Sequence, residues 1–254
     1  MASENQPIYI RSVLNFRDAG GLPTVDGKRI KERFIFRSAK PDNISRKDLN
    51  RLHKLNIRTI VDLRAPYETG RKNKKFDGIQ TISLPLDFER TTRERLIPLL
   101  KQKDGKDLIP VLIDSLYLEI LDGSVAVFKK IIELLLDPNN TPMLIHCQAG
   151  KDRTGIICAL IQLALDADRQ SIINGYMTSN EMILPYYKRM INLRKIISLG
   201  FFPADKVLYA ITVRSNNIES VIERVISHYG GIEGYLRSSD GGRSDVKKLR
   251  ELFT

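Results

Sequence analysis

The 254-residue sequence contains no tryptophan, only two cysteines and only three histidines. Two cysteines are too few for a disulfide-stabilised scaffold, and they suit a reducing compartment with a reactive thiol. The histidines and cysteines do not follow the spacing of a zinc site, so we expect no metal and no other cofactor. No stretch reaches the roughly 18 apolar residues of a membrane-spanning helix. The sequence therefore predicts neither a disulfide-rich module nor a transmembrane protein.

The N-terminus also lacks the basic-then-apolar order of a signal peptide. We therefore expect a protein that stays in the cytoplasm or is secreted by a route that reads no such signal. Residues 1–7 are predicted to form a flexible tail. Because no linker, composition break or internal repeat divides the rest, we expect residues 1–254 to form a single domain.

Acidic residues are fewer than basic ones, and the formal net charge is +11. Such a charge suits nucleic acid, an anionic membrane surface, or phosphorylated substrates. The densest basic run, Arg71–Lys75, is predicted to be a solvated loop, and no aromatic residues are interleaved with it. We therefore expect no nucleic-acid partner. Phosphorylated proteins, phosphoinositides and an anionic membrane remain, and the sequence does not set the oligomeric state.

The most informative stretch runs from Met143 to Gly155 and reads Met-Leu-Ile-His-Cys-Gln-Ala-Gly-Lys-Asp-Arg-Thr-Gly. Its first residues are an apolar run after a turn-forming segment, which predicts a buried strand. The following residues, 156–165, are apolar on nearly all sides, which predicts a buried helix. The loop between them would present backbone N–H groups and a helix N-terminus to one point. Such a loop is a natural anion site.

The side chains of this loop suit attack of sulfur on phosphorus. Helix N-termini and neighbouring cations favour the thiolate form of cysteine, so Cys147 is expected to be the nucleophile. Arg153 can clamp two phosphate oxygens with its planar guanidinium group. Thr154 can donate its hydroxyl to the thiolate, and His146 can fix the loop backbone through its ring N–H. Together they predict a phosphate-monoester hydrolase with a phosphocysteine intermediate.

The remaining loop residues Gln148, Ala149, Gly150 and Lys151 are predicted to bind the substrate phosphate, together with Thr154. Leaving-group expulsion also needs an acid, and many tyrosine phosphatases carry it on a loop that begins with tryptophan. This chain has no tryptophan. Asp152 beside Arg153 and Asp87 after a predicted strand are the two candidates, and the choice between them stays open.

Two other classes of protein fit parts of the pattern. A catalytically inactive phosphate- or phosphoinositide-binding module would keep the loop but need neither Cys147 nor Arg153. A sulfur-transfer or arsenate-reducing enzyme could use a similar loop without an acid beside the arginine, so Asp152 separates that class from a phosphatase.

The rest of the chain alternates predicted strands and helices, which favours an α/β fold with a central, mostly parallel sheet. The loop from Cys147 would then lie at the carboxyl edge of the sheet. The predicted strands are 33–38, 57–63, 79–86 and 143–145. The predicted helices are 45–55, capped by Ser45; 91–121, broken at Pro98 and Pro110; 125–136, capped by Ser124; 156–165; and most of the chain from residue 169.

Large apolar residues gather between Met182 and Phe202. They include Leu193, Ile197 and Phe201. The favoured interpretation is core packing. The alternative is an apolar lid or a lipid-facing wall over the active site.

The chain resembles the bacterial protein-tyrosine and lipid phosphatases along nearly its whole length. The resemblance rests on the segments 15–21, 36–38, 62–68 and 146–155, and more weakly on 229–235. It implies a cysteine-phosphatase fold with extra C-terminal helices that cover the pocket, no metal, and action on phosphotyrosine, other phosphoproteins and phosphoinositides.

The resemblance also assigns residues within the loop. It implies that Lys151 is a cation beside the phosphate and that Asp152 is the general acid. Arg64 and Asp87 are expected to support the site. Tumour-suppressor-type phosphoinositide phosphatases carry a second lysine directly after the cysteine, where this chain has Gln148. That difference speaks against a strong preference for highly phosphorylated inositol head groups.

Overall fold

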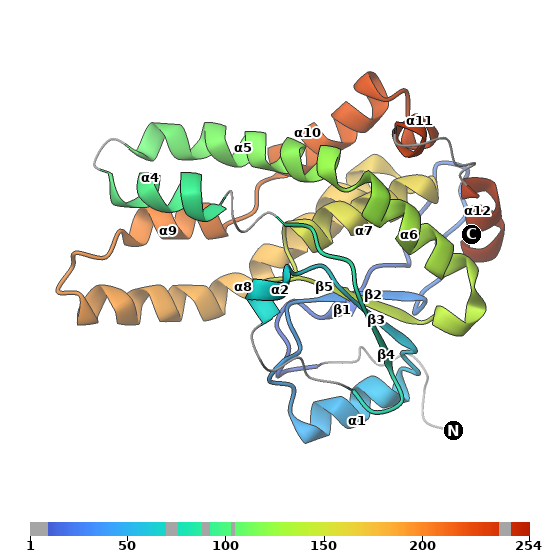
Figure 1. The fold of residues 1–254 in the computed structure, drawn as a ribbon, viewed down its shortest axis with the longest axis horizontal. Coiled ribbons are helices and arrows are strands. Elements are labelled where there is room, and N and C mark those ends of the chain that lie inside the picture. The colour runs from blue at the N-terminus through green and yellow to red at the C-terminus, as the bar shows by residue number, and fades with distance from the viewer. Residues whose placement is uncertain (1–9, 70–75, 88–91, 103–104, 239–244) are drawn as a thin grey trace.

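The computed structural model describes residues 10–69, 76–87, 92–102, 105–238 and 245–254. Within them the strands form a five-stranded sheet in the order β1-β2-β5-β3-β4 (Figure 1). β2, β5, β3 and β4 run parallel, and β1 is antiparallel to β2. The strands are β1 (Arg17–Asp18), β2 (Ile35–Ser38), β3 (Thr59–Asp62), β4 (Gln80–Ser83) and β5 (Met143–His146). The expected α/β fold with a mostly parallel sheet is confirmed. The predicted tail at 1–7 and the basic run at 71–75 lie outside the described residues.

The sheet separates two hydrophobic cores, because successive side chains of a strand point to opposite faces. Val61 and Ile145 face a large core shared with most of the helices. Ile60 and Leu144 face a smaller core that includes Leu52 of α1. All four strand residues are fully buried. The central strands therefore read as continuous apolar runs, as expected for a parallel sheet covered on both faces.

The helices lie mostly on one side of the sheet, with α1 on the other (Figure 1). Before the central strand β5 they are α1 (Arg46–Lys54), α2 (Pro66–Thr69), a π-helical turn (Thr92–Leu96), α4 (Ile97–Lys101), α5 (Gly105–Gly123), α6 (Val125–Leu136) and a 3₁₀ turn (Pro138–Asn140). After β5 they are α7 (Arg153–Ala164), α8 (Arg169–Ile197), α9 (Ala204–Ile211), α10 (Ser215–Glu223), a π-helical turn (Arg224–His228), α11 (Ile232–Arg237) and α12 (Val246–Phe253). In the described part of the chain, none of these helices combines the length and the hydrophobicity needed to span a bilayer.

The predicted helix ends are partly right. Ser45 caps α1, because its side chain accepts a hydrogen bond of 3.2 Å from the backbone N–H of Asp48. Ser124 precedes α6 but does not cap it with its side chain. Its hydroxyl instead donates to Leu121 O at 3.0 Å and lies 2.9 Å from the Tyr235 hydroxyl. The predicted side-chain cap at Ser124 was wrong, because its hydroxyl bonds to the end of the preceding helix and to Tyr235 instead.

Pro110 does not break the helix in which it lies. α5 continues through it from Gly105 to Gly123. Pro110 lies in the second turn of α5, where its fixed φ is compatible with the helix and its missing N–H costs one intrahelical hydrogen bond. The expected break at Pro98 is confirmed, since the π-helical turn Thr92–Leu96 ends directly before α4, in which Pro98 is the second residue.

α7 follows the central strand and is buried on nearly all sides, as its apolar sequence predicted. Ile156, Ile157 and Leu160 are fully buried. Helices α5, α6, α8, α10, α11 and α12 all contact it. The helix that holds Arg153 at its N-terminus is therefore fixed from several directions.

The favoured interpretation of the apolar residues between Met182 and Phe202 was wrong for most of the large side chains. Ile191 is buried, but Leu193, Ile196, Ile197, Leu199 and Phe201 are exposed. The distal half of α8 extends away from the sheet (Figure 1). Among the described residues, these five side chains stay more than half exposed.

Candidate active site

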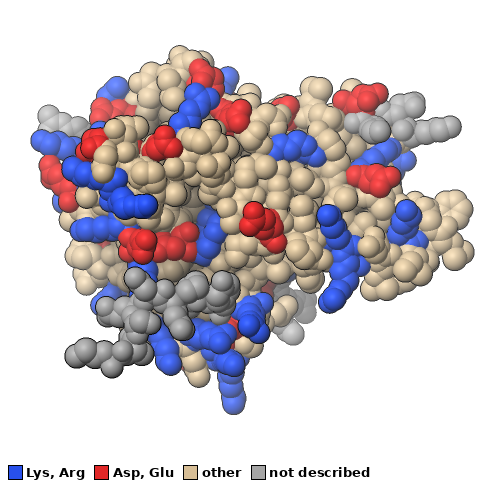
Figure 2. Space-filling model, turned by 180° about the vertical axis from the view of Figure 1, so that it is seen from behind, with Lys and Arg blue, Asp and Glu red and all other residues tan. Residues whose placement is uncertain are grey.

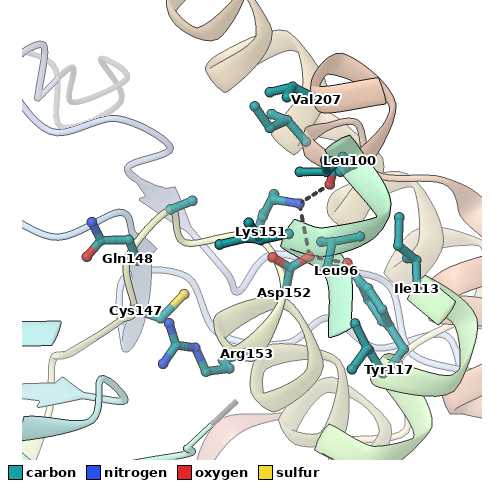
Figure 3. Close-up of a pocket in the computed structure, with 15 residues that line it drawn as sticks. Leu96, Leu100, Ile113, Tyr117, Cys147, Gln148, Lys151, Asp152, Arg153 and Val207 are labelled. Carbon is teal, nitrogen blue, oxygen red and sulfur yellow. Dashed lines mark hydrogen bonds and ion pairs between the residues drawn. The ribbon is translucent and has the colours of Figure 1, made fainter. Parts of the chain in front are cut away.

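The loop between β5 and α7 lies at the carboxyl edge of the parallel strands, as predicted. Cys147 follows the last residue of β5, and Arg153 is the first residue of α7. Both are nearly buried, with exposed fractions of 3% and 5%. The loop places them on one cavity of about 280 Å³ (Figure 3). A thiol and a guanidinium group thus share one concave site at the end of the central strand.

Six of the predicted site residues line this cavity. They are Cys147, Gln148, Ala149, Lys151, Asp152 and Arg153. The facing wall is apolar and comes from α4, α5 and α9, with Leu100, Ile113 and Val207 among its side chains (Figure 3). Gly150, Thr154, His146, Arg64 and Asp87 do not line the cavity. The site is therefore polar at its base and apolar along its side.

Gly150 allows the loop to fold back on β2. Its φ is +67°, and a Cβ at this position would lie 2.3 Å from the carbonyl carbon and oxygen of Ser38. An L-residue with a side chain would have both a disfavoured backbone and a clash. Only glycine lets the loop lie this close to the neighbouring strand.

Two side chains far away in the sequence hold the loop backbone. Asn15 Nδ2 donates to Gly150 O at 2.7 Å, and Arg37 Nη2 donates to the same oxygen at 2.8 Å. Arg17 in turn donates to Asn15 Oδ1 and to Ser179 of α8. Because the C=O and N–H of a peptide group point in opposite directions, the N–H of Lys151 points away from Asn15 and Arg37. These residues thus fix the direction of a loop N–H group. The segments that contain them contributed to the resemblance, but sequence reasoning gave the residues no role.

Arg153 forms a buried, bidentate ion pair with Glu68. The Nη1–Oε2 and Nη2–Oε1 distances are 2.5 and 2.7 Å, and both side chains are at most 6% exposed. Burial alone would lower the pKa of Arg153, but the hydrogen bonds to Glu68, with Cys147 and Asp152 nearby, raise it above its ordinary value. Arg153 Nη1 also lies 3.2 Å from Leu86 O. Sequence reasoning missed Glu68, whose only signal was its place in the segment 62–68.

Asp152 is held at the cavity by two neighbours. The Tyr117 hydroxyl donates to Asp152 Oδ1, and Lys151 Nζ lies 3.2 Å from the same oxygen (Figure 3). Tyr117 is also hydrogen-bonded to the hydroxyl of Tyr176 on α8. Burial, together with Asp152 and Tyr176, raises the pKa of Tyr117 well above its ordinary value. Tyr117 therefore stays protonated at neutral pH and donates to Asp152.

Lys151 reaches from the loop to α9. Besides its ion pair with Asp152, its Nζ donates to Ala210 O at 3.2 Å. The lysine expected to face the phosphate thus also connects the loop to a helix that forms the wall of the cavity.

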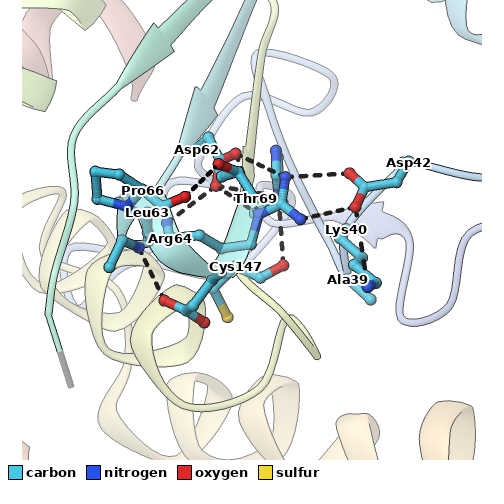
Figure 4. A network of polar contacts seen from close by, with 12 residues as sticks. Ala39, Lys40, Asp42, Asp62, Leu63, Arg64, Pro66, Thr69 and Cys147 are labelled. Atoms are coloured by element: carbon cyan, nitrogen blue, oxygen red, sulfur yellow. Dashed lines mark hydrogen bonds and ion pairs between the residues drawn. The ribbon is translucent and has the colours of Figure 1, made fainter. Parts of the chain in front are cut away.

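Arg64 belongs to a second network of polar contacts beside Cys147 (Figure 4), and His146 contacts this network through Asp62. Arg64 is buried, and its Nη2 and Nη1 lie 2.8 Å from Asp62 and Asp42 respectively. His146 Nδ1 lies 3.3 Å from Cys147 O and 3.7 Å from Asp62 Oδ1. Burial lowers the pKa of His146, so its ring is neutral at pH 7. Both residues support the strand end from which Cys147 projects.

Two expectations about single side chains need separate accounts. The hydroxyl of Thr154 is buried and has no hydrogen-bond partner among the described residues, so its expected bond to Cys147 is not formed. Thr154 lies in the first turn of α7, whose buried packing fixes its position. Asp87 is exposed, accepts a hydrogen bond from the Tyr67 hydroxyl, and does not line the cavity. Within the described residues, no three His, Cys, Asp or Glu side chains are grouped to hold a metal ion.

Comparison with known proteins assigns the chain to a family. A sequence profile of the tyrosine phosphatase family matches residues 8–254. The chain belongs to the tyrosine phosphatase family. The predicted resemblance is confirmed, and it makes this protein a phosphatase.

Relatives of this phosphatase are found in bacteria. One, provisionally named a tyrosine-protein phosphatase, comes from Cupriavidus necator, is 26% identical, and aligns over 94% of this chain and 85% of its own. The triple specificity protein phosphatase PtpB of Mycobacterium tuberculosis is 25% identical over 94% of this chain and 96% of its own. A solved structure of TpbA from P. aeruginosa with phosphotyrosine is 14% identical, with a TM-score of 0.38 over 87% of this chain and 85% of its own.

The close approach at Gly150 predicts a specific loss of activity. We expect Gly150→Ala to lower the phosphatase kcat/KM about 100-fold, because a loop shifted by about an ångström no longer aligns its groups. Gly27→Ala is the matched control, since Gly27 has a φ of +82° and no described atom lies within 4 Å of a Cβ there. The control should cost roughly 1 kcal/mol of stability and leave turnover unchanged. Equal losses in both variants would show that backbone strain alone is responsible.

The buried ion pair predicts a joint loss of stability and activity. Glu68→Gln removes the charge opposite Arg153, and we expect the free energy of unfolding to fall by about 3 kcal/mol. Activity should fall at least about tenfold, because Arg153 loses the group that orients it. Asp122→Asn is the control, since Asp122 forms a bidentate ion pair with Arg224 at the surface. That variant should change stability by less than about 1 kcal/mol. Denaturant unfolding and initial rates measure both effects, and wild-type values for Glu68→Gln would contradict this role of the pair.

Proposed function

We propose that this phosphatase hydrolyses phosphate monoesters through a covalent phosphocysteine, with Cys147 as the nucleophile. One observation carries the proposal: Cys147, Asp152 and Arg153 line the same cavity at the N-terminus of α7. The three groups are the nucleophile, the proton donor and the oxyanion clamp that such a reaction needs. An inactive binding module would need neither Cys147 nor a donor at Asp152.

The first chemical step transfers the phosphoryl group to sulfur. The Cys147 thiolate attacks phosphorus, and the bond from phosphorus to the leaving oxygen breaks while Asp152 protonates that oxygen. Arg153 and the loop N–H groups of residues 148–151 stabilise the charge on the remaining phosphate oxygens. Arg153 can do this because Glu68 already orients its guanidinium group.

The second step restores the enzyme. Asp152, now ionised, accepts a proton from water as the water attacks phosphorus, and the S–P bond breaks to release inorganic phosphate and the thiolate. The step uses no metal, and we propose that the enzyme is metal-independent.

The cavity wall bears on the substrate class. We propose phosphotyrosine in proteins and phosphoinositides as substrates, since the side chains above the loop are apolar and suit an aromatic ring or the apolar part of a lipid. The name of the mycobacterial relative, a triple specificity protein phosphatase, supports a broad substrate range. Comparison of kcat/KM over a panel of phosphopeptides and phosphoinositides ranks the two classes.

We also propose an anionic membrane surface as a partner, on the basis of the net charge of +11. The two free cysteines, Cys147 and Cys158, favour a reducing compartment. We therefore propose that the protein acts in the cytoplasm, with secretion as the alternative. Its organisation as a single domain over 1–254 stays a prediction.

Replacement of the nucleophile tests the mechanism directly. Cys147→Ser should lower turnover at least about 10³-fold while substrate binding persists, because a serine hydroxyl stays protonated and is a poor nucleophile. Cys158→Ser is the matched control, since Cys158 is a buried thiol on α7 outside the cavity.

Wild-type activity should survive EDTA. Activity lost in EDTA and restored by a divalent ion would contradict the metal-independent reaction.

Asp152 and Asp87 can be distinguished as the general acid by how each substitution changes the rate on substrates with good and poor leaving groups. Asp152→Asn should slow hydrolysis of tyrosine phosphate far more than hydrolysis of an activated aryl phosphate, whose phenolate leaves without a proton. Asp87→Asn should slow both substrates by less than about twofold, because Asp87 lies outside the cavity. The measurement is kcat/KM for each variant on each substrate. The reverse pattern would assign the acid to Asp87.

A further inference from the structure

The distal end of α8 and the turn that follows it expose a contiguous set of large apolar side chains. We refer to residues 193–201 as the α8–α9 tip. Among the described residues of this segment, five large apolar side chains are between 57% and 90% exposed: Leu193, Ile196, Ile197, Leu199 and Phe201. Single exposed apolar residues are ordinary on a protein surface, but a continuous patch marks an interaction site. The tip lies at the far end of the protruding arm of helices in Figure 1.

The apolar surface of the tip follows the geometry of the helix. Tyr186, Leu193 and Ile197 are seven and four residues apart, so they lie on one face of α8. All three are exposed. The turn after α8 extends this face with Leu199 and Phe201. The apolar face of α8 is therefore turned toward solvent here. In a helix that packs on a core, the apolar face is buried.

The backbone at the tip supports a functional reason for this exposure. Leu199 has a φ of 51°, in the left-handed region, and the next residue, Gly200, has a φ of 88°. A leucine in this conformation is strained, and asparagine or glycine would be more stable there. The side chain of Leu199 is 87% exposed, so burial within the chain does not offset the strain. The fold therefore gains nothing from leucine at this position.

Basic side chains flank the apolar surface. Lys188, Arg189, Arg194 and Lys195 are all exposed, and Arg194 lies 5.9 Å from the ring centre of Phe202. From residue 186 to residue 206 the chain carries five basic residues and one acidic residue. In the space-filling view, the protruding end on the right is largely tan, with blue and some red side chains beside it (Figure 2). Apolar side chains beside a cluster of positive charges are typical of segments that lie in the interface of an anionic membrane.

We propose that the α8–α9 tip inserts into the head-group region of an anionic lipid bilayer. The charge pattern favours a bilayer over a second copy of the chain, because a symmetric contact through the tip would bring two basic clusters together. This inference deepens the membrane partner proposed above by naming the surface that binds it. Docking needs no phosphatase activity, so the inference stands independently of the proposed reaction. It also relates the membrane to the cavity, since α9 begins just after the tip and contributes Val207 and Ala210 to the cavity wall.

Vesicle co-sedimentation of the full chain tests the proposal. We expect binding to vesicles of phosphatidylcholine with phosphatidylserine, and at least about tenfold weaker binding to phosphatidylcholine alone. Ile196→Ser with Phe201→Ser should weaken binding at least about tenfold, because two inserted side chains are lost. Val25→Ser is the matched control, since Val25 is 76% exposed outside the tip. It should bind like the wild type.

A single substitution at the turn separates membrane binding from folding. Leu199→Asn should keep or raise the melting temperature, because asparagine tolerates the left-handed backbone, and should weaken vesicle binding severalfold. Turnover of a small soluble aryl phosphate should be unchanged, which reports an intact active site. Failure of the wild type to sediment, or equal sedimentation of all variants, would overturn the proposal. So would dimerisation that the tip variants abolish in the absence of vesicle binding.

Discussion

The buried ion pair between Arg153 and Glu68 is the interaction on which the site depends. Arg153 begins α7, after the central strand, and Glu68 lies in α2, after the neighbouring strand β3. The pair therefore joins the chain segments that leave two adjacent parallel strands. Burial of a charged side chain costs free energy unless the charge is paired. Neither Arg153 nor Glu68 can therefore be buried here without the other. This requirement fixes the guanidinium group beside Cys147 before any substrate arrives.

The rest of the fold can be understood as support for that arrangement from three sides. Asn15 and Arg37 hold the carbonyl of Gly150 from the antiparallel edge of the sheet. Arg64, through Asp62, holds the end of β3 next to His146. Tyr117 and Tyr176, from α5 and α8, hold Asp152 at the cavity. Preorganised groups of this kind cost little further reorganisation during a reaction, which is how a fixed polar site stabilises developing charge.

α8 serves two different surfaces along its length. Its first half packs on the core, and Gly175 and Ser179 accept hydrogen bonds from Arg17, which in turn contacts Asn15. Its second half extends beyond the sheet and exposes the α8–α9 tip. α9 then returns to the cavity, where Lys151 donates to Ala210 O. One continuous segment thus connects the support of the phosphate loop, the exposed tip and the cavity wall.

The sequence by itself determined the features that are local. The strand, loop and helix around Cys147 are contiguous, and their pattern is set by apolar runs and one glycine, so the loop and its position at the sheet edge could be predicted. The partners of that loop could not, because Glu68 and Asn15 are 85 and 135 residues away from the groups that they contact. Only the packed sheet and helices bring them together. The same reason explains the tip. The sequence shows large apolar residues gathered near 193–201, but tertiary structure decides whether another element covers them, and here α8 extends past its neighbours.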